Sequence, residues 1–255
     1  MDLETFSASP INANELVAHR GFRGKYPENT ILSITKAIEA GALFVELDVQ
    51  FSEDKLPIIY HDSDLSRVSG EAKSVFQMSR ASLLKVSAYE PDRLGNRYAD
   101  ETIAPLEALV AVLVRNPAVI AFVEIKDESI AHCGREAMLE TIETILEPVA
   151  KQTVIMSFDY ELCAKARASD WPLVGVVLEA WQDLESDRIQ QIEPDFIYVD
   201  HEIIPENYDL PASEFLANST LVAYEVGNRS LGYALLARGV DMLETYEIEA
   251  MMASD

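Results

Sequence analysis

Eight short apolar runs recur along this 255-residue chain, and segments with helical spacing separate most of them. The runs are rich in branched and aromatic residues, which is typical of strands buried on both faces. Strands that alternate with helices pair in parallel, because each helix carries the chain back across the sheet. The pattern therefore predicts an α/β fold, a (β/α)8 TIM barrel. The predicted strands are Leu16–Arg20, Leu43–Val49, Ile120–Lys126, Val154–Phe158, Leu173–Leu178, Phe196–Asp200, Leu221–Glu225 and Met242–Thr245.

Helices are predicted between these strands from apolar residues repeating every three or four positions. In the first, Asn29 or Thr30 serves as the N-cap and Gly41 ends the helix. The later helices are predicted at Leu106–Arg115, Arg135–Leu146, Tyr160–Ala168, Leu184–Ile192, Ser213–Ala217 and Ser230–Ala237.

One connection departs from this alternation. Too few residues separate Asp48 from His61 for a helical crossover, so we expect a hairpin that places His61 beside Asp48. From about residue 63 to 104 the sequence has no clear periodicity. The chain is therefore predicted to be a single barrel domain over 1–255, with an insertion or small subdomain at about 51–104.

Charge and composition exclude several classes of protein. The formal net charge of −24 argues against nucleic-acid binding, which requires a basic surface. No run reaches the roughly 18 apolar residues of a membrane span, so stable membrane insertion is not expected. Met1–Asn14 lacks the features of a secretory signal, and Cys133 and Cys163 have no metal-binding spacing. These observations predict a cytoplasmic protein with reduced cysteines.

Two carboxylates interrupt the apolar strand at 43–49. Side chains two positions apart lie on the same face of a strand, so Glu46 and Asp48 point the same way. Burying two unpaired carboxylates costs several kcal/mol. A hard divalent cation such as Mg²⁺ or Ca²⁺ would compensate them, and so would nearby Arg or Lys side chains. These two residues alone leave both explanations open.

Other polar side chains are predicted at the same end of the barrel. The C-terminal ends of the strands form the active-site face in this fold. His19 and Arg20 end the first strand, and Glu124 and Lys126 repeat the alternation seen at Glu46 and Asp48. With His61 from the hairpin, the pattern predicts a functional site with three inward carboxylates, two histidines and two cationic side chains.

The ordered motifs in this chain resemble those of the glycerophosphodiester phosphodiesterases, which are barrels of the phosphatidylinositol phospholipase C type. The resemblance covers essentially the whole chain. The motifs that carry it are His19-Arg20-Gly21, Pro27-Glu28-Asn29-Thr30, Glu46-Leu47-Asp48-Val49, His61-Asp62 with the following leucine and Arg67, and Glu124-Ile125-Lys126.

The resemblance implies a role for each of these groups. It implies that Glu46, Asp48 and Glu124 bind one divalent cation, Mg²⁺ or Ca²⁺. It also implies acid–base roles for His19 and His61, and phosphate or substrate contacts from Arg20, Lys126 and Tyr224.

Two segments near the end depart from the family pattern. Tyr224-Glu225-Val226-Gly227-Asn228 replaces a common Trp-Thr-Val-Asn, and Thr245-Tyr246-Glu247-Ile248 replaces a common Thr-Asp-x-Pro. The residues implied in catalysis are all present, so these departures concern the wall facing the glycerol or the leaving group.

The implied reaction is hydrolysis of a small glycerophosphodiester to glycerol 3-phosphate and an alcohol. One histidine would accept the proton of the attacking hydroxyl and the other would protonate the leaving alkoxide. The sequence leaves open which histidine is the base. It also leaves open whether water attacks directly or the glycerol hydroxyl first forms a cyclic phosphate.

Three other functions are compatible with a barrel of this kind to different degrees. A lysophospholipase D would use the same residues on lipids. An amidohydrolase barrel would need a His-x-His pair, but Arg20 and Gly21 follow His19. A non-catalytic phosphodiester-binding protein would be expected to lack one of the key histidines or carboxylates.

The segment after His61 favours small soluble diesters over lipids. Residues 64–104 carry six basic and six acidic residues, and they contain no basic amphipathic helix or long apolar run. We expect a monomer or a homodimer.

Overall fold

The computed structural model describes residues 10–253, in which eight parallel strands form a closed ring. The strand order is β1-β10-β9-β8-β7-β6-β5-β2, and β1 pairs with β2 to close it. The predicted TIM barrel is therefore confirmed. The ring consists of β1 (Leu16–Ala18), β2 (Phe44–Phe51), β5 (Ile120–Ile125), β6 (Thr153–Ser157), β7 (Val174–Val177), β8 (Phe196–Asp200), β9 (Thr220–Tyr224) and β10 (Met242–Thr245).

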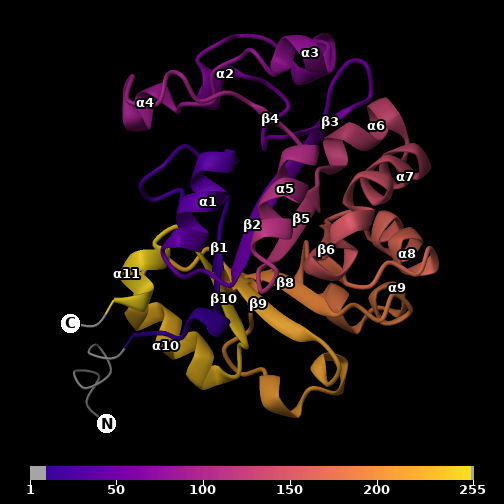
Figure 1. The fold of residues 1–255 in the computed structure, drawn as a ribbon. Coiled ribbons are helices and arrows are strands. Elements are labelled where there is room, and N and C mark those ends of the chain that lie inside the picture. The colour runs from indigo at the N-terminus through magenta and orange to yellow at the C-terminus, as the bar shows by residue number, and fades with distance from the viewer. Residues whose placement is uncertain (1–9, 254–255) are drawn as a thin grey trace.

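Helices surround this ring in Figure 1. Three predicted helices agree closely with the structure: α5 (Glu107–Arg115), α7 (Arg135–Leu146) and α8 (Tyr160–Ala168). In α1 (Ile31–Glu39) the N-cap is Thr30, whose hydroxyl accepts a hydrogen bond from the Ser33 amide. The other α-helices outside the ring are α6 (Ile130–Cys133), α9 (Asp187–Gln190), α10 (Arg229–Arg238) and α11 (Ile248–Met252).

Two predicted helices were wrong in form. The segment 184–192 is divided into a 3₁₀ turn, η6 (Trp181–Glu185), and α9, because Ser186 between them is extended at φ −76° and ψ 142°. The Ser186 side chain caps α9, which explains why the helical spacing does not continue through it. The predicted helix at 213–217 is a single 3₁₀ turn, η9 (Glu214–Leu216).

The hairpin predicted after β2 is confirmed. β3 (Pro57–Ile59) pairs antiparallel with the end of β2, and the Tyr60 amide donates to the Asp48 carbonyl. The chain then forms α2 (Ser66–Ser69), η3 (Val75–Gln77), α3 (Arg80–Leu83), α4 (Pro91–Leu94) and β4 (Ala104–Pro105), which pairs with β3.

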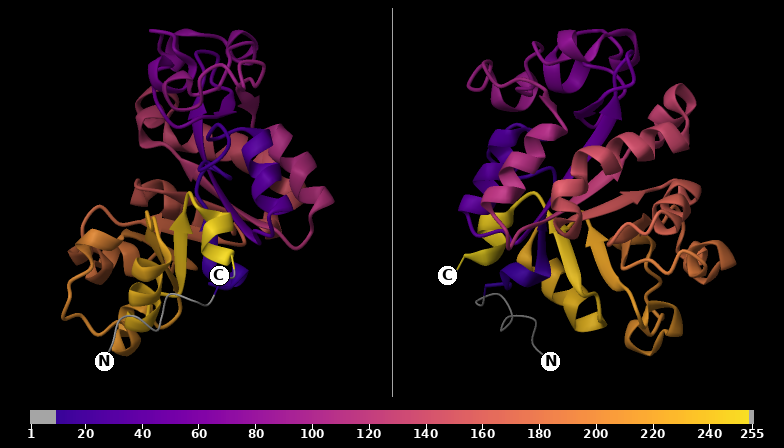
Figure 2. Two further views of the ribbon diagram at one scale, coloured as in Figure 1. Left: turned by 90° about the vertical axis from the view of Figure 1, so that its left-hand side faces the viewer. Right: turned by 45° about the vertical axis from the view of Figure 1, so that its right-hand side comes forward.

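This β3–β4 segment has its own small core, which includes Ile58, Leu65, Val75 and Leu83. It lies beyond the C-terminal end of β2 in Figure 1 and in the views of Figure 2.

The side chains of the barrel strands divide into two layers. On β2, Val45, Leu47 and Val49 join the core beneath the helices. The ring interior is filled by Val17, Phe122, Val154, Met156, Val177, Tyr198, Val222 and Met242. Glu46 and Asp48, which alternate with the outward residues of β2, therefore face the ring interior, as the sequence predicted.

Cys133 and Cys163 are free thiols. Among residues 10–253, none of the helices has both the length and the apolar character needed to cross a bilayer. The expectation that Met1–Asn14 is not a secretory signal concerns in part residues 1–9, which lie outside the described residues.

Candidate active site

A pocket of about 180 Å³ opens where the barrel strands end. Seven of the eight predicted site residues line it, and the eighth, Glu46, is buried beneath it at 1% exposure. The lining residues are His19, Arg20, Asp48, His61, Glu124, Lys126, Phe158, Val177, Tyr198, Tyr224, Glu225 and Glu244.

Strand register brings the three predicted carboxylates together. Asp48 of β2 pairs directly with Glu124 of β5, and Glu46 lies two residues earlier on the same face of β2. One oxygen from each of the three can be chosen so that all lie within 4.8 Å of one another. Oxygen Oε1 of Glu46 is buried and has no hydrogen-bond partner in the described structure. An unpartnered buried carboxylate oxygen within an all-oxygen cluster fits a site for a hard divalent cation.

The pKa values of these carboxyls show how poorly the cluster is compensated. Burial, followed by repulsion from Asp48 and Glu244, raises the pKa of Glu46 well above its usual value. Burial also raises the pKa of Glu124, although Lys126 opposes this. Burial acts in the same direction on Asp48, but Arg20 and Lys126 outweigh it and hold its pKa below the usual range.

Asn29 orients Asp48 and was not predicted as a site residue. Its side-chain amide donates to Asp48 Oδ2 at 2.8 Å, and its Oδ1 accepts from the Asp48 backbone amide at 3.0 Å. Asn29 has a left-handed backbone with φ 53°, a conformation that asparagine adopts more readily than most residues. The sequence suggested only a capping role, which belongs to Thr30 instead.

The loop after β1 places Arg20 over the carboxylates. The Arg20 amide donates to Glu46 Oε2 at 2.9 Å, and its guanidinium Nε lies 3.1 Å from Asp48 Oδ2. Gly21 follows at φ +75°, and a Cβ there would lie only 2.5 Å from the Ser33 hydroxyl oxygen. Glycine therefore allows this loop to pack against the start of α1.

A buried carboxylate, Glu28, links the loop to the β3–β4 segment. Glu28 is 1% exposed and accepts from Arg20 at 2.9 Å and from Arg67 at 2.7 and 2.8 Å. Arg23 also contacts it at 2.7 Å. Arg67 in turn donates to both oxygens of Asp62. This ionic network fixes Asp62 relative to the barrel mouth.

His61 is held by its sequence neighbour. Its Nδ1 lies 2.6 Å from Asp62 Oδ1, and its Nε2 lies 3.4 Å from Lys126 Nζ. Because Asp62 accepts from Nδ1–H, Nε2 is the ring nitrogen available to the pocket. Lys126 also donates to Glu124 Oε1 at 2.6 Å.

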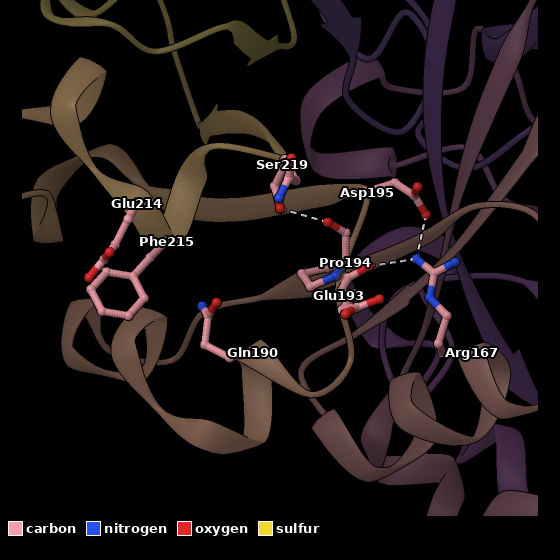
Figure 3. A pocket seen from close by; sticks show the side chains of 9 residues that line it. Arg167, Gln190, Glu193, Pro194, Asp195, Glu214, Phe215 and Ser219 are labelled. Atoms are coloured by element: carbon pink, nitrogen blue, oxygen red, sulfur yellow. Dashed lines mark hydrogen bonds and ion pairs between the residues drawn. The ribbon is translucent and has the colours of Figure 1, made fainter.

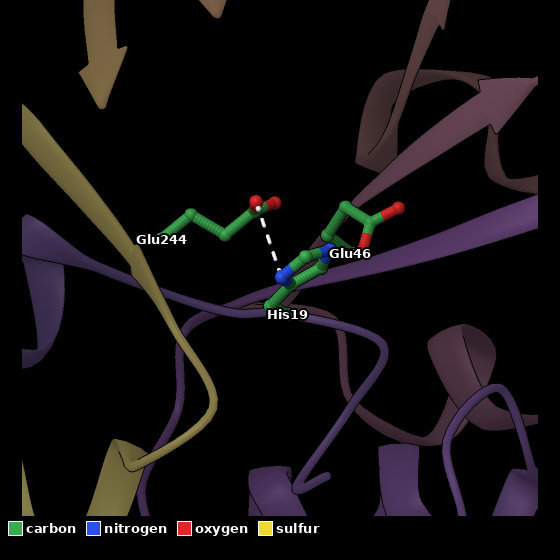
Figure 4. A group of neighbouring side chains, drawn as sticks. All are labelled: His19, Glu46 and Glu244. Atoms are coloured by element: carbon green, nitrogen blue, oxygen red, sulfur yellow. Dashed lines mark ion pairs between the residues drawn. The ribbon is translucent and has the colours of Figure 1, made fainter. Parts of the chain in front are cut away.

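His19 lies among carboxylates from both sides of the ring. Its Nε2 is 3.7 Å from Glu46 Oε2, and its Nδ1 is 3.5 Å from Glu244 Oε2. Figure 4 shows Glu46 and Glu244 on opposite sides of the imidazole. Burial and then the charge of Arg20 lower the pKa of His19, which favours the neutral ring.

Glu225 and Glu244 are pocket residues that the sequence reasoning missed. Burial and the charge of Glu124 raise the pKa of Glu244 well above its usual value. A signal for Glu244 was present, because it alternates with Leu243 and Thr245 on a predicted barrel strand. On β10 it pairs with the inward-facing Val17 of β1, so it also faces the interior.

The aromatic wall of the pocket consists of Phe158, Tyr198 and Tyr224. Tyr224, a predicted substrate contact, lies at the end of β9, and burial raises the pKa of its hydroxyl. The Tyr198 hydroxyl is buried without a hydrogen-bond partner in the described structure. His132, Asp200 and His201 are not among the residues that line this pocket.

A larger hollow of about 470 Å³ lies at the opposite end of the strands (Figure 3). Asp195 and Ser219, immediately before β8 and β9, help to line it. Arg167 donates there to Asp195 Oδ2 at 2.6 Å and to the Glu193 carbonyl at 2.8 Å, so its guanidinium is already engaged. The eight predicted site residues all lie at the C-terminal ends of the barrel strands instead.

The structure is a TIM barrel with an acidic pocket at the C-terminal ends of its strands. A sequence model of the Glycerophosphoryl diester phosphodiesterase family matches residues 19–244, and the chain belongs to that family.

Curated relatives share part of this sequence. Human "Glycerophosphodiester phosphodiesterase 1" is 30% identical over 154 residues, which cover 60% of this chain and 45% of that protein. A "Glycerophosphodiester phosphodiesterase" of Caldanaerobacter subterraneus subsp. tengcongensis is 31% identical over 142 residues, or 56% of each chain. The chain thus spans about half the length of the curated relatives it matches.

Solved structures share the complete fold. A putative glycerophosphoryl diester phosphodiesterase from Silicibacter pomeroyi superposes with a TM-score of 0.79 at 18% identity, covering 98% of this chain and 95% of its own. A phosphodiesterase from Oleispira antarctica, solved with the product sn-glycerol-3-phosphate, gives a TM-score of 0.76 at 23% identity, covering 98% and 97%. At these identities the likeness concerns the fold.

Proposed function

We propose that this chain hydrolyses small glycerophosphodiesters to glycerol 3-phosphate and an alcohol. The observation that carries the proposal is the convergence of Glu46, Asp48 and Glu124 with His19 and His61 at one barrel mouth. Membership of the family supports it. The product named for the Oleispira antarctica phosphodiesterase is that of the proposed reaction.

In this proposal Glu46, Asp48 and Glu124 hold one divalent cation, Mg²⁺ or Ca²⁺. When bound, the cation supplies positive charge that stabilises the negative charge developing on the phosphoryl oxygens. The unpartnered Glu46 oxygen and the raised pKa values of Glu46 and Glu124 support this assignment. Positive charge close to these carboxyls would favour their ionised forms.

The protein's own cationic groups bind and orient the phosphodiester. Arg20 and Lys126 both line the pocket, and both are held in place by carboxylates. Lys126 Nζ lies 3.4 Å from His61 Nε2, so a phosphate bound to Lys126 would lie close to that nitrogen. Tyr224 and Phe158 would contact the organic part of the substrate.

The two histidines perform the proton transfers. His61 presents Nε2 to the pocket because Asp62 holds Nδ1. His19 is on the other side of the carboxylate cluster, next to Glu46. Two such groups on either side of a phosphodiester provide one base for the attacking hydroxyl and one acid for the leaving alkoxide. We also propose a cytoplasmic protein, on the basis of the two free cysteines.

The test measures glycerol 3-phosphate released from glycerophosphocholine, with Mg²⁺, with Ca²⁺ and with excess chelator. We expect chelation to abolish turnover and to lower the melting temperature, because a ligand bound by the folded state stabilises it. Asp48→Asn should likewise abolish turnover, and it should no longer retain the cation. Glu53→Gln, at an exposed carboxylate just after β2, is the matched control and should behave like the wild type. Full turnover in chelator, without retained metal, would refute the cation assignment.

A further inference from the structure

Three side chains from the last two barrel strands and their loops gather at His19. Glu225 follows β9, Glu244 lies on β10, and Tyr246 follows β10. Glu225 and Tyr246 belong to the two segments that depart from the common family pattern, and Glu244 immediately precedes the second of them.

The positions of these side chains fix the orientation of the His19 ring. Tyr246 stacks on the imidazole with a centroid distance of 4.7 Å and an interplanar angle of 12°. Glu225 Oε1 and Glu244 Oε2 both lie 3.5 Å from Nδ1. Nε2 points the other way, toward Glu46 (Figure 4). Nε2 is therefore the ring nitrogen that faces the proposed cation ligands.

Burial distinguishes the two carboxylates beside Nδ1. The Glu244 side chain is 4% exposed, whereas that of Glu225 is 43% exposed and is screened by water. Nδ1 is itself buried and has no hydrogen-bond partner in the described part of the chain. A buried ring nitrogen without a partner costs free energy, and a small side-chain rotation would bring Glu244 into hydrogen-bonding range. Hydrogen bonds of this kind are often long before substrate binds.

The second histidine provides a precedent within the same pocket. His61 directs Nδ1 to the carboxylate of Asp62 and Nε2 to the pocket. His19 likewise has a carboxyl group beside Nδ1, that of the buried Glu244, although at 3.5 Å rather than 2.6 Å. In this case the carboxylate comes from the other end of the chain.

Building on the proposed function, we propose that Glu244 is a positioning residue for His19. One of its carboxyl oxygens accepts a hydrogen bond from Nδ1–H, so that Nε2 is the nitrogen that exchanges a proton with the substrate. A carboxylate behind an imidazole selects the ring tautomer and orientation in this way. Glu244 does not itself touch the reacting atoms.

The first test compares Glu244→Leu with Glu225→Leu. Leucine removes the acceptor at either site, and replacing a buried carboxylate by an apolar side chain is often compatible with folding. For Glu244→Leu we expect kcat to fall about 10²-fold while KM changes less than about twofold. The loss for Glu225→Leu should be smaller, since that carboxylate is half exposed. Thermal melting checks that both variants fold.

The second test measures the tautomer directly in the wild-type protein. Nitrogen-15 spectra of histidine-labelled, Mg²⁺-loaded protein at about pH 8, where free imidazole is neutral, report which ring nitrogen carries hydrogen. The His19 signals are assigned by their loss in His19→Gln. We expect hydrogen on Nδ1 in the wild type and a shift toward the other tautomer in Glu244→Leu.

Three results would overturn the proposal: hydrogen on Nε2 in the wild type, a kcat for Glu244→Leu within about twofold of the wild type, or loss of a bound Mg²⁺ ion in Glu244→Leu. The last would make Glu244 a cation ligand, since atoms of His19, Glu46 and Glu244 also lie within 4.8 Å of one another. If the wild type hydrolyses no diester, the proposed function fails, but the spectra still decide whether Glu244 holds His19.

Discussion

The strands that begin the barrel and those that close it contribute differently to the mouth. β1, β2 and β5, with the hairpin after β2, provide the predicted cation ligands, both histidines and both cationic side chains. β9 and β10 with their loops provide Tyr224, two further carboxylates and the tyrosine stacked on His19. The first group matches the family motifs and the second departs from them. In the proposed mechanism the reacting groups lie on one side of the ring, while the other side orients His19 and shapes the wall of the pocket.

The largest effects should come from the histidines on the first side. We expect His61→Ala and His19→Ala each to lower turnover by roughly 10²–10⁴-fold, the usual range for losing an acid or base. The wild type should show a bell-shaped dependence of activity on pH, and each variant should lose one limb. Steady-state kinetics across pH would measure this.

His132→Ala is the matched control, because its Nε2 contacts the Ser52 carbonyl and it does not line the pocket. Near wild-type turnover in either active-site variant would remove that histidine from the mechanism and break the division between the two sides.

A second prediction concerns the ionic network of Glu28 with Arg20, Arg23 and Arg67. Burial alone would raise the pKa of Glu28, but Arg67, Arg20 and Arg23 outweigh it and lower the pKa. Glu28→Gln leaves buried guanidinium groups without their counter-charge, so we expect a loss of about 3–5 kcal/mol in the free energy of unfolding. Urea denaturation at neutral pH would measure it.

The pH dependence of this loss follows from the direction of the shift. Because the folded pKa of Glu28 lies below its unfolded value of about 4.3, its contribution is complete above that pH and disappears as pH falls through the folded pKa. The difference between wild type and Glu28→Gln should therefore shrink under acid conditions. Glu71→Gln, at an exposed pair with Lys73, should change stability by less than about 1 kcal/mol and serves as control. A constant difference down to about pH 3 would contradict the role of the Glu28 charge.

The smallest predicted effect concerns substrate choice. Four of the six basic residues of segment 64–104 form ion pairs within the protein: Arg67 with Glu28, Lys73 with Glu71, Arg80 with Glu107, and Arg93 with Glu90. Little basic surface then remains to attract an anionic bilayer. We expect kcat/KM for glycerophosphocholine to exceed that for lysophosphatidylcholine by about tenfold or more. A preference for the lipid under the same conditions would favour the lysophospholipase D alternative.

The sequence predicted the positions of site residues where those positions depend on neighbouring residues. Glu46 and Asp48 were identified as one inward-facing pair because their spacing matches the strand period. The turn after β2 was too short for a helix and so predicted the position of His61. Both inferences use only neighbouring residues, and the structure agrees with both.

The residues that were missed depend on distant contacts or backbone detail. Asn29 was considered only as a helix cap, and its bond to Asp48 depends on a left-handed backbone that the sequence does not reveal. Glu244 alternates correctly on its strand, but its partner His19 lies near the other end of the chain. A single helix was predicted at 184–192, but the structure has a 3₁₀ turn followed by α9. Ser186 between them is extended and caps α9.

The closure of the barrel also has a consequence for biosynthesis. A ribosome that has translated as far as Lys126 has already produced every residue of the proposed cation site, and both histidines. The Glu244 carboxylate emerges only with the last strand of the ring, which pairs with the first. If Glu244 positions His19, a nascent chain contains the proposed cation ligands and both histidines long before His19 is oriented. Hydrolysis at the full rate would therefore begin only when synthesis of the barrel is nearly complete.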